Sequence, residues 1–77
     1  MMQDTELYKR MGARIRQRRL ELGWTQVEAS LILQIPQTTL SDYETGSRRA
    51  RLGRIVEIAS GYKTTPCELA FGFVGAI

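Results

Sequence analysis

Hydrogen-bonding side chains between residues 37 and 42 are the part of this sequence best suited to chemistry. Gln37 has an amide that both donates and accepts, and Asp42 has a carboxylate that only accepts. Thr38 and Ser41 add hydroxyls, which can do either. Because the chain has no histidine to act as a base beside them, we expect these groups to recognise a partner molecule rather than to catalyse a reaction on it.

The rest of the composition argues against catalytic and metal sites. The 77 residues include no histidine and a single cysteine, Cys67, so neither a zinc cluster nor an intrachain disulfide can form. The sequence also has no phosphate-binding loop and no paired-carboxylate site. We therefore expect no enzymatic activity, no cofactor and no metal ion, and Cys67 is expected to be inert.

Arginine is the main source of the net charge of +3 and outnumbers lysine by nine to two. Eight of the arginines fall in two clusters, Arg14 to Arg19 and Arg48 to Arg54. The arginine fork suits phosphate groups, although basic clusters also serve simply as solvated surface. The clusters flank the helix pair described next, and this position favours contact with a nucleic acid.

Two short helices joined by a tight turn are predicted in the middle of the chain. Thr25 and Glu28 have the spacing of a capping box, in which each side chain bonds the backbone N–H of the other. Pro36 must end the first helix and can start the second. In the second helix Leu40 and Tyr43 share one face, so the polar side chains occupy the outward edge.

Three further helices are predicted around this pair. One helix precedes the pair and runs from about Glu6 to Leu22, with Asp4 or Thr5 as its cap. Two helices follow the pair. The fourth helix of the chain carries a wide apolar face, and the fifth begins at Thr65, with Pro66 at its first helical position. The expected apolar positions of these elements are Tyr8, Met11, Ile15, Leu22, Trp24, Leu52, Ile55, Val56, Ile58, Ala59, Leu69 and Phe71.

The central pair carries a motif that can be compared with known domains. It reads Thr25-Gln26-x-Glu28-Ala29, then Ile35 in the turn, then Gln37-Thr38-Thr39-Leu40-Ser41-x-Tyr43-Glu44-x-Gly46. This pattern resembles the helix-turn-helix DNA-binding domain of Cro and the phage lambda repressor, an XRE-like family. The resemblance covers roughly residues 7 to 69 and implies an all-α, compact five-helix fold. We expect one domain over residues 1–77, with a core of about 5–71 and a short apolar tail at 72–77.

The resemblance implies that the second helix of the pair enters the major groove of double-stranded DNA. Its base-reading residues are then Gln37, Thr38, Ser41 and Asp42. Gln37 can meet N6 and N7 of adenine, and Thr38 can place its methyl against thymine or its hydroxyl on a base. Asp42 either accepts a hydrogen bond from a cytosine N4 amine or pairs with a neighbouring arginine.

Contacts outside the groove are implied in the same way. The resemblance gives Gln26 two roles, binding a phosphate and bracing the first residue of the recognition helix. It pairs Arg19 with Glu44, which would tie the first helix to the third. The phosphate-binding residues expected from the resemblance and the charge pattern are Gln26, Thr39, Ser47, Arg48, Arg49, Arg51 and Arg16.

The sequence departs from the family pattern at the turn. Gln34 stands where glycine is common, and a left-handed glutamine costs on the order of 1 kcal/mol. Pro36 stands where serine or threonine commonly caps the recognition helix, so that cap is lost. Ala29 and Ser30 replace a usual leucine and alanine. We expect these changes to affect how the base-reading residues are aligned with the DNA, but not to change the fold.

Three functions fit these observations. The first is a repressor that binds a palindromic operator as a homodimer, whose interface the apolar tail could join. The second is an antitoxin that binds a toxin partner and autoregulates its operon, and the third is a controller of a restriction-modification operon. With no apolar run of membrane length and no secretory signal, we expect a cytoplasmic protein, associated with the nucleoid when bound.

Overall fold

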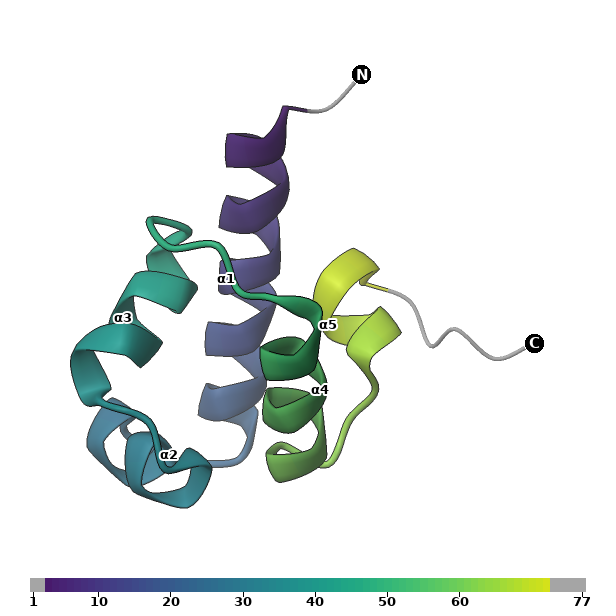
Figure 1. The fold of residues 1–77 in the computed structure, drawn as a ribbon. Coiled ribbons are helices and arrows are strands. Elements are labelled where there is room, and N and C mark those ends of the chain that lie inside the picture. Colours follow the sequence, from purple (N-terminus) through teal and green to yellow (C-terminus); the bar gives the residue numbers. More distant parts are fainter. Residues whose placement is uncertain (1–2, 73–77) are drawn as a thin grey trace.

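Five helices make up the computed structural model, which describes residues 3–72 (Figure 1). They are α1 (Asp4–Glu21), α2 (Gln26–Leu33), α3 (Gln37–Thr45), α4 (Leu52–Gly61) and α5 (Pro66–Phe71). Residues 3–72 contain no strand, so the predicted all-α fold of five helices is confirmed. Within this range no helix has the length and apolar character needed to cross a membrane. The tail at 73–77, considered above for the dimer interface, lies outside the described residues.

The start of α1 differs from the prediction. Gln3 precedes the helix in an extended conformation and makes no side-chain cap. The expectation that Asp4 or Thr5 caps the helix is wrong, because both residues lie inside its first turn. Asp4 and Glu6 there place negative charge beside the positive end of the helix dipole. The two carboxylates therefore interact favourably with the start of α1, although neither side chain caps it.

Local signals determine both ends of the helix-turn-helix. Thr25 accepts from the Glu28 N–H at 3.1 Å and donates its own N–H to the Glu28 carboxylate at 2.8 Å, which confirms the capping box and lowers the pKa of Glu28. Gln34 takes the left-handed conformation at φ 58° and ψ 44°. Pro36 precedes α3 without a side-chain cap, and Gly46 ends the helix at φ 79°. The turn thus retains the shape that glycine usually allows.

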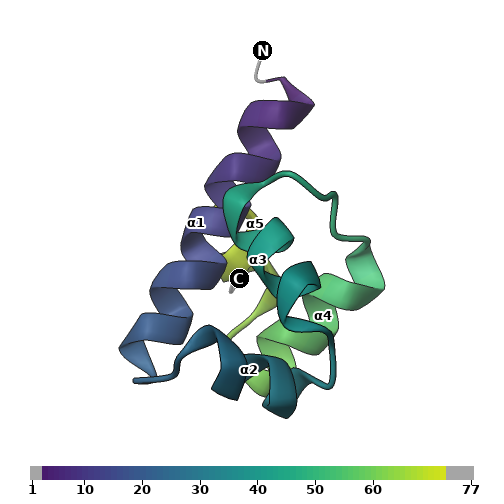
Figure 2. The same cartoon turned by 90° about the vertical axis from the view of Figure 1, so that its left-hand side faces the viewer.

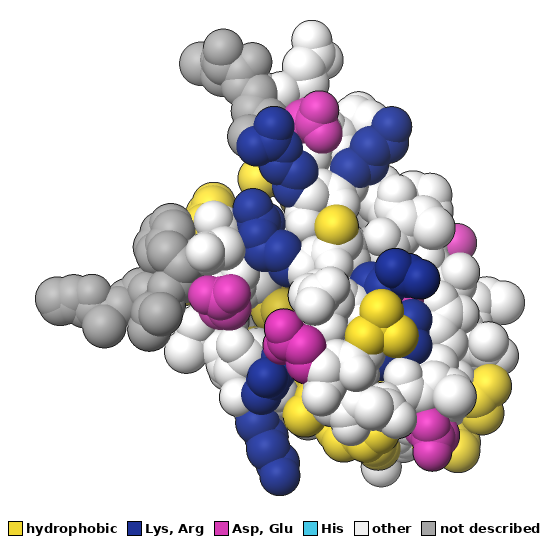
Figure 3. All heavy atoms as spheres, turned by 180° about the vertical axis from the view of Figure 1, so that it is seen from behind, with side chains coloured by type: hydrophobic (Ala, Val, Ile, Leu, Met, Phe, Trp, Pro, Cys, Tyr) yellow, Lys and Arg dark blue, Asp and Glu magenta, His cyan; other side chains and the backbone are white. Residues whose placement is uncertain are grey.

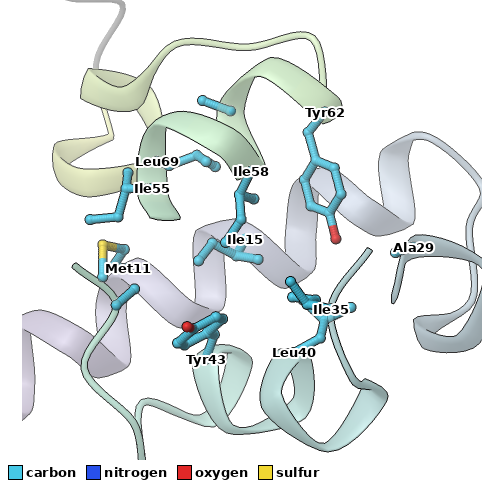
Figure 4. Close-up of a cluster of buried hydrophobic side chains, with 12 residues drawn as sticks. Met11, Ile15, Ala29, Ile35, Leu40, Tyr43, Ile55, Ile58, Tyr62 and Leu69 are labelled. Atoms are coloured by element: carbon cyan, nitrogen blue, oxygen red, sulfur yellow. The ribbon is translucent and has the colours of Figure 1, made fainter. Parts of the chain in front are cut away.

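The apolar core lies between the five helices, and α2 contributes Ala29 to it (Figure 4). α1 packs against α3 and α5, and α2 packs against α3 and α4. The face that α4 buries is narrower than predicted, because Leu52 and Val56 are 73% and 47% exposed. The buried apolar side chains are Met11, Ile15, Ala29, Ile35, Leu40, Tyr43, Ala50, Ile55, Ile58, Ala59, Tyr62 and Leu69.

α1 and α3 approach each other most closely at Gly12. A Cβ built on this residue would overlap the backbone carbonyl oxygens of Tyr43 and Glu44. The two helices are therefore in direct backbone contact at a point where any other residue would push them apart. This contact fixes how deeply α3 sits against α1.

We expect Gly12→Ala to lower the free energy of unfolding by about 1–3 kcal/mol, since α1 has to move away from α3. Gly53→Ala is the matched control. Gly53 is also helical, and nothing lies within 4 Å of its added Cβ, so this change should raise the free energy of unfolding by up to about 1 kcal/mol. Denaturant unfolding of both variants measures the difference, and equal effects would contradict the close contact.

Tyr62 brings a hydroxyl into the core. Its side chain is fully buried, and its ring meets that of Trp24 edge to face, with 5.8 Å between the ring centroids. The Tyr62 Oη has no hydrogen-bond partner among the described residues. Burial raises the pKa of Tyr62 to about 12, and the nearby Glu44 carboxylate adds to this effect.

The raised pKa predicts a loss of stability in alkali. Unfolded tyrosine releases its proton near pH 10, whereas folded Tyr62 holds it to about pH 12, so between these values the unfolded state binds fewer protons and stability falls as the pH rises. We expect Tyr62→Phe to reduce this fall and to stabilise the protein at pH 7 by about 1 kcal/mol. Thermal unfolding across this pH range measures both effects. Destabilisation at pH 7 would indicate that the hydroxyl has a bonding partner.

Candidate nucleic-acid interface

α3 lies on the outside of the molecule, between α1 and α4 and beside α2 (Figure 2). Its inner edge consists of Leu40, Tyr43 and Glu44, all of which are buried. Small polar and acidic side chains cover the opposite edge, as the helical spacing predicts. In chain order they are Thr38, Ser41, Asp42 and Thr45, of which Thr38 and Thr45 are exposed and the other two are half-buried.

A buried ion pair holds the end of α3 against α1. Arg19 Nε donates to Glu44 Oε2 at 2.7 Å and Arg19 Nη2 donates to Glu44 Oε1 at 3.0 Å, a forked arrangement. The two side chains are only 7% and 2% exposed. Arg19 Nη1 also donates to the carbonyl of Trp24 at 2.8 Å. The hydrogen bonds to Glu44 raise the pKa of Arg19, so the guanidinium stays charged in the interior.

Gln26 and Gln37 extend this pair towards the surface. Gln26 Nε2 donates to Glu44 Oε1 at 3.1 Å, and Gln26 Oε1 accepts from Gln37 Nε2 at 3.5 Å. Glu44 can only accept, which sets the direction of both bonds. The Gln37 amide therefore keeps two groups for another partner. Its Oε1 can accept a hydrogen bond, and the second N–H of its Nε2 can donate one.

The first arginine cluster is mainly internal. Arg14 Nη1 donates to the carbonyl of Ala70 at 3.0 Å, at the end of α5. Arg18 Nε donates to the carbonyl of Tyr62 at 2.9 Å, at the end of α4. With Arg19 in the buried pair, three arginines of this cluster stabilise helix packing. The expectation that this cluster favours DNA contact is therefore wrong for Arg14 and Arg18, whereas the expected pairing of Arg19 with Glu44 is present.

Arg16 is the exception in the first cluster. It is exposed, and it lies one helical turn after Gly12, where α1 contacts α3. Helical spacing puts Arg16 on the same face of α1 as Gly12. Within residues 3–72 no hydrogen bond or ion pair is found for its side chain. The face seen in Figure 3 mixes basic and acidic side chains.

The second arginine cluster lies on the loop between α3 and α4. Arg48 Nε is 3.6 Å from the Asp42 carboxylate, and Arg49 Nη1 is 3.5 Å from that of Asp4. Arg49 also lies over the ring of Tyr8, 5.7 Å from its centroid. These pairs are exposed, and pairs of this kind contribute only about 0–1 kcal/mol. A phosphate could therefore replace the carboxylate as the partner of either arginine.

An open basic hollow separates the recognition helix from α4. Its volume is about 620 Å³, and Arg51 lies at its edge, directly before α4. Neither α3 nor α4 has a side-chain cap, so their first backbone N–H groups remain free to bind an anion. Thr39, in the uncapped first turn of α3, is half-buried. The lining of the hollow comprises Tyr43, Arg48, Arg49, Arg51, Gly53, Arg54 and Glu57.

Sequence reasoning missed two residues of this surface. Thr45 is exposed on the outer edge of α3, and its hydroxyl lies 3.0 Å from that of Ser47. Its spacing of four from Ser41 was the available signal. Lys9 lies against Gly46, whose missing side chain allows the backbone of α1 to approach. That contact joins residues 37 positions apart, and no local pattern indicates it.

The fold is that of a helix-turn-helix protein of the DNA-binding kind. The chain belongs to the helix-turn-helix family, which matches residues 15–69, and the resemblance to Cro-like domains is thereby confirmed. No curated protein matches the sequence.

A solved structure is similar to this fold. It is the crystal structure of a hypothetical transcription factor, NHTF, from Neisseria, with a TM-score of 0.81 and 20% sequence identity. The match covers 92% of this chain and 82% of that chain. At this identity the likeness supports the fold alone.

Arg16 and Arg18 should respond differently to substitution. We expect Arg16→Ala to weaken binding to every duplex and to lower the salt slope by about one, with no loss of stability. Arg18→Ala should lower stability by about 1–3 kcal/mol, because the carbonyls that it bonds lose their donor, and should leave the salt slope unchanged. Fluorescence anisotropy at several salt concentrations and thermal unfolding measure the two effects. An unchanged salt slope in Arg16→Ala would place this side chain away from the DNA.

Proposed function

We propose that this protein is a sequence-specific regulator that binds double-stranded DNA and represses transcription by occupying its operator. The supporting observation is the two-sided character of α3. Its inner edge is anchored by Leu40, Tyr43 and the buried Glu44, while its outer edge is polar and accessible. A helix held rigidly in this way fits the major groove of DNA and presents its first turns to the base edges.

Gln37 is the principal base reader in this proposal. The free oxygen and the remaining N–H of its amide match N6 and N7 of adenine, which offer one donor and one acceptor. Guanine presents two acceptors in the same groove and would need two donors. The bond to Gln26 therefore supports adenine over guanine at this position. Thr38, Ser41 and Asp42 read neighbouring bases from the same face of the helix.

The phosphate contacts surround the groove-facing helix. Arg48 and Arg49 exchange their weak carboxylate partners for phosphates, and Ser47 lies beside them on the loop. The uncapped helix N-termini add backbone N–H donors to these contacts. The side chains proposed to hold the sugar-phosphate backbone are Gln26, Thr39, Ser47, Arg48, Arg49, Arg51 and Arg16.

A homodimer on a palindromic operator completes the proposal. An apolar hollow of about 350 Å³ between α1, α4 and α5 supports it, because Leu52 and Phe71 are 73% and 57% exposed at its edge. A second copy would cover this apolar surface. The hollow is lined by Leu7, Tyr8, Met11, Ala50, Arg51, Leu52, Ile55, Pro66, Cys67, Ala70 and Phe71. Two recognition helices related by a two-fold axis would read half-sites about 34 Å apart.

Selection of bound sequences from random duplexes tests the function. We expect an enriched palindrome with adenine at the position read by Gln37. On this site Gln37→Ala should cost about 1–3 kcal/mol of binding free energy and relax the preference at that base pair, since a bidentate contact is lost. Titration of the selected duplex and of its adenine-to-guanine variant measures both effects.

Gln17→Ala is the matched control for this experiment. Gln17 is an exposed glutamine of α1 that bonds the Glu21 carboxylate and lies near Glu68 and Leu69 of α5. Its loss should leave binding unchanged. If Gln37→Ala weakens binding to selected and random duplexes by the same amount, Gln37 does not read a base. Failure of the wild-type protein to bind any duplex at low salt would overturn the proposed function.

A further inference from the structure

An ion pair spans the outer edge of α3 and the loop that follows it. Asp42 lies on the groove-facing edge, and its carboxylate is 3.6 Å from Arg48 Nε. Ser47 Oγ is 3.4 Å from Asp42 Oδ1 and donates to the Asp42 carbonyl at 3.3 Å. The backbone N–H of Arg48 bonds the same carbonyl at 3.3 Å. The loop therefore holds Arg48 close to the one carboxylate on the outer edge of the helix.

This arrangement has opposite consequences on different DNA sequences. On a random duplex Arg48 gains a phosphate only by leaving Asp42, whose negative charge then faces the phosphates without a partner. On a site with cytosine beneath Asp42, the N4 amine donates to the carboxylate in place of Arg48. The arginine is then free for a phosphate with no carboxylate left unpaired.

We infer that the Asp42–Arg48 pair is a specificity device that weakens binding to non-cognate DNA more than binding to the operator. The inference rests on the proposed function and adds a repulsive element to the attractive contacts of the other readers. Under this inference Asp42 affects binding even on DNA sequences where its carboxylate contacts no base. Its effect is to increase the ratio of operator affinity to random-DNA affinity.

The chain contains a natural control for this effect. Asp4 and Arg49 form a second carboxylate–arginine pair at 3.5 Å, with side chains 67% and 69% exposed. Asp4 begins α1 and is not on the outer edge of α3. Removing its charge frees a loop arginine for phosphate, as removal of the Asp42 charge does, but it changes no group that faces the bases.

The test compares Asp42→Asn with Asp4→Asn on the selected duplex and on a random duplex over a range of salt concentrations. We expect Asp42→Asn to tighten binding to random DNA by about three- to tenfold, with a salt slope larger by about one, and to leave operator affinity unchanged or weaker. Selection with this variant should lose the cytosine preference. Asp4→Asn should tighten binding to both duplexes by the same factor and leave their ratio unchanged.

Two results would overturn the inference. If Asp42→Asn tightens binding to both duplexes by the same factor, Asp42 only reduces the general electrostatic attraction to DNA. If the substitution weakens binding to the selected duplex and leaves binding to the random duplex unchanged, Asp42 reads a base and has no repulsive role. Circular dichroism and thermal unfolding check that both variants fold. Wild-type binding to the selected duplex separates these results from a failure of the proposed function, in which no duplex is bound.

Discussion

The buried pair of Arg19 and Glu44 is the interaction on which the rest of the site depends. A charge left alone in this interior would cost several kcal/mol, so α1 and α3 can pack only where the two groups meet. Gly12 permits the required approach of the two backbones. From Glu44 the hydrogen bonds run outward through Gln26 to Gln37. The orientation of an exposed amide is thus set by a carboxylate in the core.

Arginine serves two separate purposes in this small protein. In α1 the guanidinium groups of Arg14 and Arg18 donate to backbone carbonyls near the ends of α5 and α4. Helix ends have carbonyls without intrahelical partners, and a long forked side chain can satisfy them from a neighbouring element. On the loop after α3, Arg48 and Arg49 have only exposed carboxylate partners. Those weak pairs leave their charge available to an anionic partner, which in the proposed function is the DNA phosphate.

Much of the fold could be predicted because its signals are local. The Thr25–Glu28 capping box and the break at Pro36 each depend on a few neighbouring residues, and both are present. The roles of Arg14 and Arg18 could not be predicted in this way, because the carbonyls they bond lie more than forty positions along the chain. The close contact at Gly12 is equally non-local. The pattern of small and charged residues indicates where a site lies, but tertiary packing decides which charges remain free for it.

A nuclear magnetic resonance titration of the isotopically labelled protein with its selected duplex would show which surface contacts the DNA. We expect the largest amide shifts in α3 and in the loop at 47–51, with smaller shifts at Arg16. Amides around Tyr62 and at the end of α5 should stay near their free positions. If the largest shifts lie over the apolar hollow between α1, α4 and α5 and the amides of α3 do not shift, the outer edge of α3 does not enter the groove.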